Sequence, residues 1–136
     1  MSDLGQLLGD EPDLVARLSN AAALIKEKMG FFWVGFYLVS GSELVLGPFQ
    51  GPIACMRIGY GRGVCGTAWK EARAVVVPDV EEFPGHIACS SLSKSEIVVP
   101  VKREGEVIGV LDIDSVDLSA FDHIDAFWLE RLVAIL

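Results

Sequence analysis

Within the first thirty residues, positions 14–29 carry apolar side chains at the spacing of an amphipathic helix. Apolar positions recur every three or four residues from Leu14 to Met29, with polar residues between them. Asp10 is a residue type favoured at helix N-caps, and acidic residues and a proline follow it, as in many first helical turns. Gly30 is expected to end the helix. We therefore predict an N-terminal helical segment over residues 1–30, used for packing or dimer contacts.

Aromatic and β-branched residues dominate the next stretch, 31–39, which is typical of a strand buried on both faces. Alternation places Trp33 and Tyr37 on the same face, and their polar groups make that face the better candidate for a ligand pocket. A turn leads to a short return strand at 44–46. Residues 47–52 are predicted to be loop, because two glycines and two prolines interrupt the pattern.

The second half of the chain predicts two further helices and three strands. The expected elements are a helix at 64–72, strands at 74–77, 96–101 and 107–114, and a helix at 121–136. In the last helix the side chains expected to face inward are those of Phe121, Ile124, Phe127, Trp128, Leu132 and Ile135. The strands on either side of residues 103–106 should form an antiparallel hairpin. This order predicts a single α+β domain over residues 1–136, an antiparallel sheet with packed helices.

The composition limits the classes of function. A chain of 136 residues can bury a core as one domain without disulfide or metal support. The formal net charge of −8 argues against nucleic acid and anionic membranes as partners, because both require a basic face. No apolar run approaches the roughly 20 residues that span a bilayer, and the N-terminus lacks the pattern of a secretory signal. We therefore expect a cytoplasmic protein whose thiols are kept reduced.

Three cysteines, Cys55, Cys65 and Cys89, lie within a stretch rich in glycine and proline. With His86 they could form a Cys₃His zinc site, but the close cysteine pair typical of zinc sites is absent from the sequence. They could also be inert buried thiols, since free cysteine is commonly buried. The third interpretation is thiol redox chemistry, which requires an exposed thiolate and a second thiol close enough to resolve the oxidised form.

Three acids follow on predicted strands: Glu96, and Asp112 with Asp114 on one face of the same strand. If these carboxyl groups share a desolvated pocket with the cysteine loops, they raise one another's pKa, and one can stay protonated as a general acid. The remaining charge would suit a cationic ligand group such as an α-ammonium. The alternative is that the acids are solvated strand ends.

Several short segments carry a more specific signal. They are WVGFY at 33–37, LGPFQG at 46–51, Cys55 with Arg57-Ile58, GRGVCGT at 61–67, FPGHIAC at 83–89, SEIVVP at 95–100 and GVLDIDS at 109–115. Together with the cysteine spacing, they resemble the GAF-domain free methionine-(R)-sulfoxide reductases over about residues 31–136. A generic GAF sensor would lack both the three cysteines and the Asp-Ile-Asp ending. The resemblance implies a GAF-like antiparallel sheet of about six strands with helices packed on one face.

The resemblance also implies the chemistry. The Cys89 thiolate would attack the sulfoxide sulfur of free methionine-(R)-sulfoxide, Cys55 would resolve the sulfenic acid as a disulfide, and Cys65 would have an auxiliary recycling role. Glu96 would protonate the sulfoxide oxygen. The substrate-binding residues that it implies are Trp33, Tyr37, Glu96, Asp112 and Asp114. Thioredoxin is the implied electron donor, no bound cofactor or metal is expected, and a homodimer is a candidate assembly.

One competing hypothesis is a GAF module that binds a small molecule without chemistry. Such a sensor would keep its ligand affinity after replacement of Cys89, whereas a reductase would lose its activity. It normally belongs to a longer chain with an output domain. A thiol-bound metal site would instead show stoichiometric zinc in the purified protein.

Overall fold

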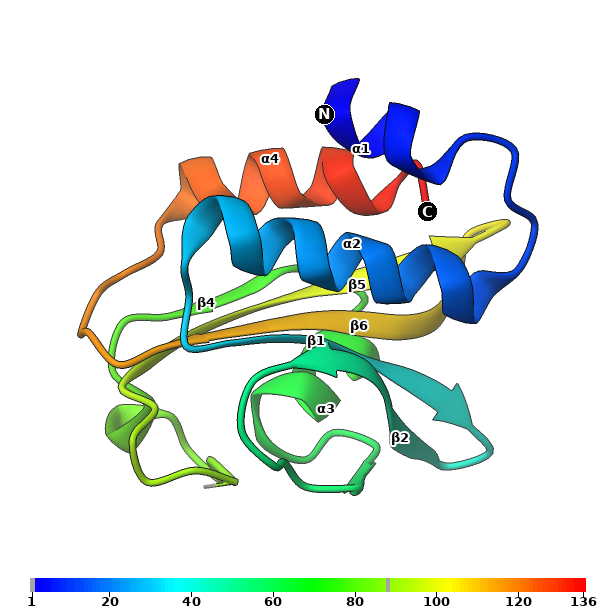
Figure 1. The fold of residues 1–136 in the computed structure, drawn as a ribbon. Coiled ribbons are helices and arrows are strands. Elements are labelled where there is room, and N and C mark those ends of the chain that lie inside the picture. Colours follow the sequence, from blue (N-terminus) through cyan, green and yellow to red (C-terminus); the bar gives the residue numbers. More distant parts are fainter. Residues whose placement is uncertain (1, 88) are drawn as a thin grey trace.

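A sheet of antiparallel strands is the centre of the fold. A computed structural model describes residues 2–87 and 89–136 (Figure 1). In chain order the elements are α1 (Ser2–Leu8), α2 (Leu14–Met29), β1 (Trp33–Ser40), β2 (Glu43–Gln50), β3 (Arg57–Gly59), α3 (Gly63–Glu71), β4 (Val75–Val77), the 3₁₀ turn η1 (Val80–Glu82), β5 (Ser95–Arg103), β6 (Glu106–Ser115) and α4 (His123–Val133). Within these described ranges, six strands form one sheet in the order β3-β2-β1-β6-β5-β4. The predicted α+β class and the β5–β6 hairpin are confirmed.

Helices cover both faces of this sheet. α1, α2 and α4 lie on one face, and α3 lies on the other with the irregular loops (Figure 1). The first face packs through a large apolar cluster that includes Leu18, Phe36 and Leu111. The second packs through a smaller cluster that includes Tyr37 and Val64. The expectation of helices on one face therefore holds for three helices, while α3 covers the opposite face. No helix in the described part of the chain is long and apolar enough to cross a membrane.

The N-terminal segment contains two helices, and the second begins later than predicted. Asp13, rather than Asp10, is the N-cap of α2, and its carboxylate accepts a hydrogen bond of 3.1 Å from a backbone N–H of the first turn. The prediction missed α1, whose two buried leucines pack into the core. Residues 9–12 are therefore used to reverse the chain between the helices. Gly30 ends α2 in the left-handed conformation, as predicted.

β2 continues through the segment predicted as loop at 47–52, and ends at Gln50. The register between β1 and β2 shifts between Gly35 and Tyr37, which places Pro48 in a β-bulge. Proline is tolerated at a bulge because the backbone N–H that it lacks is not needed there for hydrogen bonding between the strands. On its other side β2 pairs with β3 only at residues 43–45, so Pro48 interrupts no second ladder.

The last helix buries only part of the predicted inward face: Phe121 is buried and Leu132 packs against the core, but the other four side chains are exposed. The side chains of Ile124, Phe127, Trp128 and Ile135 are between 38% and 55% exposed. The buried positions of α4 are instead Ala126, Leu129 and Val133. Both sets have helical spacing, so the apolar pattern alone does not separate them. Ala126 is small, and this lets the helix backbone approach the sheet more closely than a face of aromatic residues would.

Candidate active site

Three neighbouring strands bring the predicted acidic and aromatic residues to one face of the sheet. Asp114 on β6 pairs with Trp33 on β1 and with Glu96 on β5, so these three residues form a row across the strands. Asp112 lies two residues earlier on the same face, opposite Gly35. A Cβ at Gly35 would collide with the Trp33 ring. Glycine therefore lets the indole lie over the strand beside the acids.

A pocket opens over this row of residues, and its walls come from the sheet, the first turn of α3 and two loops. The lining residues are Phe32, Trp33, Tyr37, Pro52, Ile53, Ala54, Ile58, Arg62, Gly63, Val64, Cys65, His86, Ile87, Cys89, Ser90, Ser93, Glu96, Asp112 and Asp114. Of the site residues expected from the sequence, Cys55 alone is not in the lining, and it is bonded to a cysteine that is. The fold thus gathers residues up to about 80 positions apart into one cavity.

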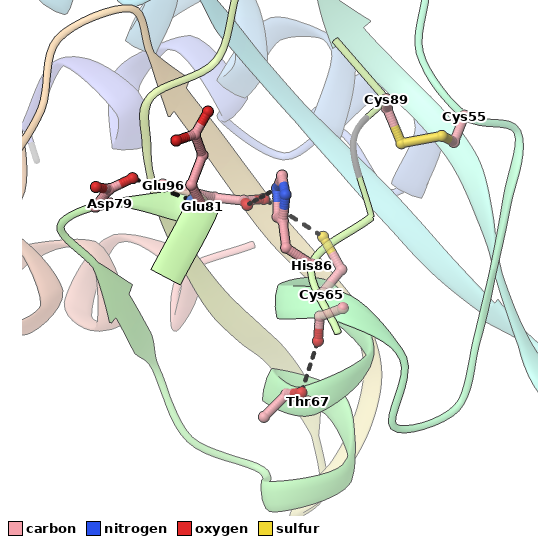
Figure 2. A network of polar contacts seen from close by, with 9 residues as sticks. Cys55, Cys65, Thr67, Asp79, Glu81, His86, Cys89 and Glu96 are labelled. Atoms are coloured by element: carbon pink, nitrogen blue, oxygen red, sulfur yellow. Dashed lines mark hydrogen bonds and ion pairs between the residues drawn. A yellow bond between two sulfur atoms is a disulfide. The ribbon is translucent and has the colours of Figure 1, made fainter. Parts of the chain in front are cut away.

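The two loops are joined by a disulfide between Cys55 and Cys89, with Cα atoms 5.3 Å apart (Figure 2). Both cysteines are only partly buried. This pairing confirms the expected bridge. It also contradicts the Cys₃His zinc site, because two of its three thiols are bonded to each other.

Two aromatic residues of β1 hold the Cys55 loop by its backbone. The indole N–H of Trp33 donates to the carbonyl of Pro52 at 3.0 Å, and the Tyr37 hydroxyl donates to the carbonyl of Cys55 at 2.8 Å. The two rings stack with centroids 6.0 Å apart. The polar groups of both residues are thus engaged with the loop, while their rings form an apolar wall of the pocket.

Buried acids and a buried thiol form the floor of the pocket. Glu96 and Asp112 are each 6% exposed, and Cys65 is the free cysteine, also buried. The Cys65 thiol donates to Glu96 Oε2 at 4.0 Å, and His86 Nε2 lies 3.9 Å from Glu96 Oε1, so these side chains point toward one another (Figure 2). Oδ1 of Asp112 is buried without a hydrogen-bond partner. The alternative of solvated strand ends is therefore wrong for Glu96 and Asp112.

Burial is the main cause of the raised pKa of each acid. The pKa of Glu96 lies well above its usual value because the group is desolvated, and the charges of Asp112 and Asp114 raise it further. Desolvation also raises the pKa of Asp112 and of Asp114. The thiol pKa of Cys65 is raised by burial and then by the charge of Asp112. The pocket therefore keeps carboxyl protons toward neutral pH and holds a proton source beside the thiols.

His86 is a pocket residue for which the sequence suggested only a zinc role. It lies three residues before Cys89 in the same loop, and that proximity is the signal that could have identified it. Burial lowers its pKa, against a smaller opposing effect from the charge of Asp112. The imidazole is thus neutral near pH 7 and can act as a hydrogen-bond partner or a ligand.

The GAF domain family matches residues 10–136. GAF domain-containing protein A of Dictyostelium discoideum is 60% identical over 96% of this chain and 83% of its own length. Free methionine-R-sulfoxide reductase of Escherichia coli K12 is 47% identical over 97% of this chain and 81% of its own length. The chain belongs to the GAF-domain free methionine-(R)-sulfoxide reductases.

A solved reductase of this family has the same fold. The structure of the free methionine-R-sulfoxide reductase from Neisseria meningitidis in complex with its substrate superimposes with a TM-score of 0.96 at 57% sequence identity. The alignment covers 98% of this chain and 81% of that chain. Membership of the reductase family and the GAF fold, both expected from the resemblance, are confirmed.

Proposed function

We propose that this chain reduces free methionine-(R)-sulfoxide to methionine, with Cys89 as the nucleophile and Cys55 as the resolving thiol. The observation that carries the proposal is the Cys55–Cys89 disulfide, whose Cys89 lines the pocket that also holds three acids of raised pKa. The chain 1–136 would act as a single GAF domain, in a compartment where thiols are kept reduced, such as the cytoplasm.

The first step joins a thiolate, a sulfoxide and a proton. The Cys89 thiolate attacks the sulfoxide sulfur, and Glu96 delivers a proton to the oxygen, so that the S–O bond of the substrate breaks. The protonated oxygen transfers to the Cys89 sulfur as the transient bond between the two sulfurs breaks, so methionine leaves and Cys89 becomes a sulfenic acid. The substrate sulfur is reduced by two electrons and Cys89 is oxidised by two. A protonated carboxyl suits this step because the oxygen gains negative charge as the S–O bond breaks.

The acids that do not donate the proton would bind the substrate ammonium. Asp112 offers a buried oxygen without a hydrogen-bond partner, and Asp114 is its neighbour on the same face. A charged ammonium supplies the hydrogen bonds that this buried group lacks. A peptide-bound methionine has an amide at that position and cannot do so, which favours the free amino acid. The rings of Trp33 and Tyr37 would enclose the methyl sulfide.

Recycling would use the second thiol and an external reductant. Cys55 attacks the sulfenic acid of Cys89, releases water and forms the observed disulfide. Thioredoxin would then reduce the disulfide through its own dithiol. No bound cofactor is needed for this cycle. The thiol of Cys65 donates a hydrogen bond to Glu96. We propose an auxiliary role in recycling for this third cysteine.

Replacing Cys55 by serine should separate the two half-reactions. With pre-reduced protein and no added reductant, we expect one methionine per chain and a persistent sulfenic acid on Cys89 that reacts with dimedone. The thioredoxin-supported rate should fall by about tenfold or more, because the resolving thiol is missing. Mass spectrometry and a coupled assay measure both effects, with the exposed neighbour variant Met56→Leu as control. An unchanged thioredoxin-supported rate would show that another thiol resolves Cys89.

A steady-state assay tests the function itself. The protein is incubated with thioredoxin, thioredoxin reductase and NADPH, and each free sulfoxide epimer is offered separately. We expect NADPH consumption with the R epimer alone. Saturable binding of the R epimer without turnover would favour a non-catalytic GAF sensor instead.

A homodimer through the exposed face of α4 fits the surface of the chain. Phe127 and Trp128 are 46% and 55% exposed and stack with centroids 5.3 Å apart. The Arg131 guanidinium lies over both rings. Trp128→Glu should convert a dimer into a monomer in light scattering after size exclusion, whereas Met56→Glu, on an exposed loop residue, should not. A monomeric unmodified protein would contradict this assembly.

A further inference from the structure

A set of donors in the floor of the pocket has the composition of a metal site. The thiol of Cys65 on α3, a carboxylate oxygen of Glu96 on β5 and one of Asp112 on β6 all lie within 4.8 Å of one another. All three residues are buried. None of these donors belongs to the disulfide, so the cluster is available while Cys55 and Cys89 are bonded to each other, unlike the Cys₃His arrangement considered from the sequence.

Two further observations point to a cation at this place. Oδ1 of Asp112 is buried and has no hydrogen-bond partner, although its residue is only 6% exposed. Such an atom is costly unless a ligand satisfies it. In addition, His86 reaches the same cluster from its loop, with Nε2 3.9 Å from Glu96 Oε1. The imidazole is thus a nitrogen donor beside the set of one sulfur and two oxygens, although it lies outside the group of atoms that are all within 4.8 Å of one another.

The spacing of these donors suits a tetrahedral ion. Zinc bonds of roughly 2.3 Å to sulfur and 2.0–2.2 Å to nitrogen and oxygen imply ligand-to-ligand distances of roughly 3.3–3.6 Å. Cys65 Sγ lies 4.0 Å from Glu96 Oε2, and His86 Nε2 lies 3.9 Å from Glu96 Oε1. These two distances run to different oxygens of Glu96, and the donors of the cluster are up to 4.8 Å apart, so contraction by up to about 1.5 Å would close the site. Mixed sulfur, nitrogen and oxygen ligands favour Zn²⁺ over Mg²⁺ or Ca²⁺.

We propose that the substrate-free pocket binds one Zn²⁺ through Cys65 Sγ, His86 Nε2 and one carboxylate oxygen each of Glu96 and Asp112. Binding converts the Cys65 thiol to a thiolate and the Glu96 carboxyl group to a carboxylate, and releases both protons to solvent. The ion is an inhibitor and takes no part in the reduction. It occupies the place of the substrate ammonium at Asp112, a consequence that rests on the proposed function, whereas the metal site itself does not.

A cobalt titration tests the site without any activity measurement. Protein with the disulfide intact is titrated with Co²⁺, which reports thiolate ligation by a near-ultraviolet charge-transfer band and tetrahedral geometry by its visible bands. We expect saturation at one Co²⁺ per chain and displacement by Zn²⁺. Cys65→Ser should abolish the charge-transfer band, and His86→Gln should weaken Co²⁺ binding by about tenfold or more.

The second histidine of the chain supplies the control. His123 is exposed on α4, and His123→Gln should leave the titration unchanged. Absence of a charge-transfer band in the unmodified protein would overturn the site. So would a band that survives in Cys65→Ser, or equal weakening by both histidine variants. His86→Gln changes a loop residue, so the test holds even if Cys65→Ser lowers stability. A negative reductase assay would not change the outcome of the cobalt titration. The reductase activity and the metal site can therefore be disproved independently.

Discussion

Replacing Cys89 by serine is expected to lower kcat/KM for free methionine-(R)-sulfoxide by at least about 10³-fold, equivalent to about 4 kcal/mol of transition-state stabilisation. A serine hydroxyl is not ionised near neutral pH and is a poor nucleophile toward sulfur, so the first bond cannot form. The measurement uses a small-molecule dithiol as reductant, because this bypasses the thioredoxin step. Chromatography of the methionine produced gives the rate directly.

The control for this variant lies in the same loop. Ser91 is exposed and outside the pocket lining, so Ser91→Ala should keep the full rate. Thermal melting of both variants under reducing conditions separates a loss of chemistry from a loss of folding. A Cys89→Ser protein that is folded and retains more than a small fraction of the rate would assign the nucleophile to another thiol.

Glu96→Gln should lower kcat by about 10²- to 10³-fold, the size of a typical general-acid contribution. The pKa of Glu96 is raised mainly by burial, so the group keeps its proton at neutral pH and loses it as the pH rises through this raised pKa. The unmodified enzyme should therefore lose activity on its alkaline limb, while the variant should lack this limb. A pH–rate profile of kcat measures both, and Glu82→Gln, on an exposed residue of η1, is the control.

The same substitution should not destabilise the fold above neutral pH. A carboxyl with a raised folded pKa contributes its full stability below its unfolded pKa and loses it as the pH rises through the folded value. Glutamine does not ionise and has no such loss. The melting temperature of Glu96→Gln at pH 8 should therefore equal or exceed that of the unmodified protein. An unchanged kcat with a raised KM would show that Glu96 binds substrate but is not the acid.

Much of the sheet could be predicted from the pattern of side chains. Alternation along residues 107–114 placed Asp112 and Asp114 on one face, and the structure confirms that both reach the same pocket. The end of α2 at Gly30 followed from the conformational freedom of glycine. These features are local, and local sequence determines them.

The errors arose where tertiary packing decides between locally equivalent choices. Pro48 is tolerated within β2 because it lies at a bulge in the β1–β2 pairing. The register of that pairing cannot be deduced from the sequence of one strand alone. Four of the six side chains expected to face inward from the last helix are exposed instead, because apolar residues occur all around that helix and contact with the sheet selects Ala126 and Leu129. The register that aligns Glu96 with Asp114, and the approach of His86, likewise depend on long-range contacts.

The most direct test of the central claim is a single turnover followed residue by residue. Pre-reduced protein is mixed with one equivalent of free methionine-(R)-sulfoxide without reductant, and the quenched protein is digested and mapped by mass spectrometry. We expect one methionine per chain and a new disulfide between the Cys55 and Cys89 peptides, with no methionine from the S epimer. Methionine formed equally from both epimers, or formed while Cys55 and Cys89 stay reduced, would contradict it.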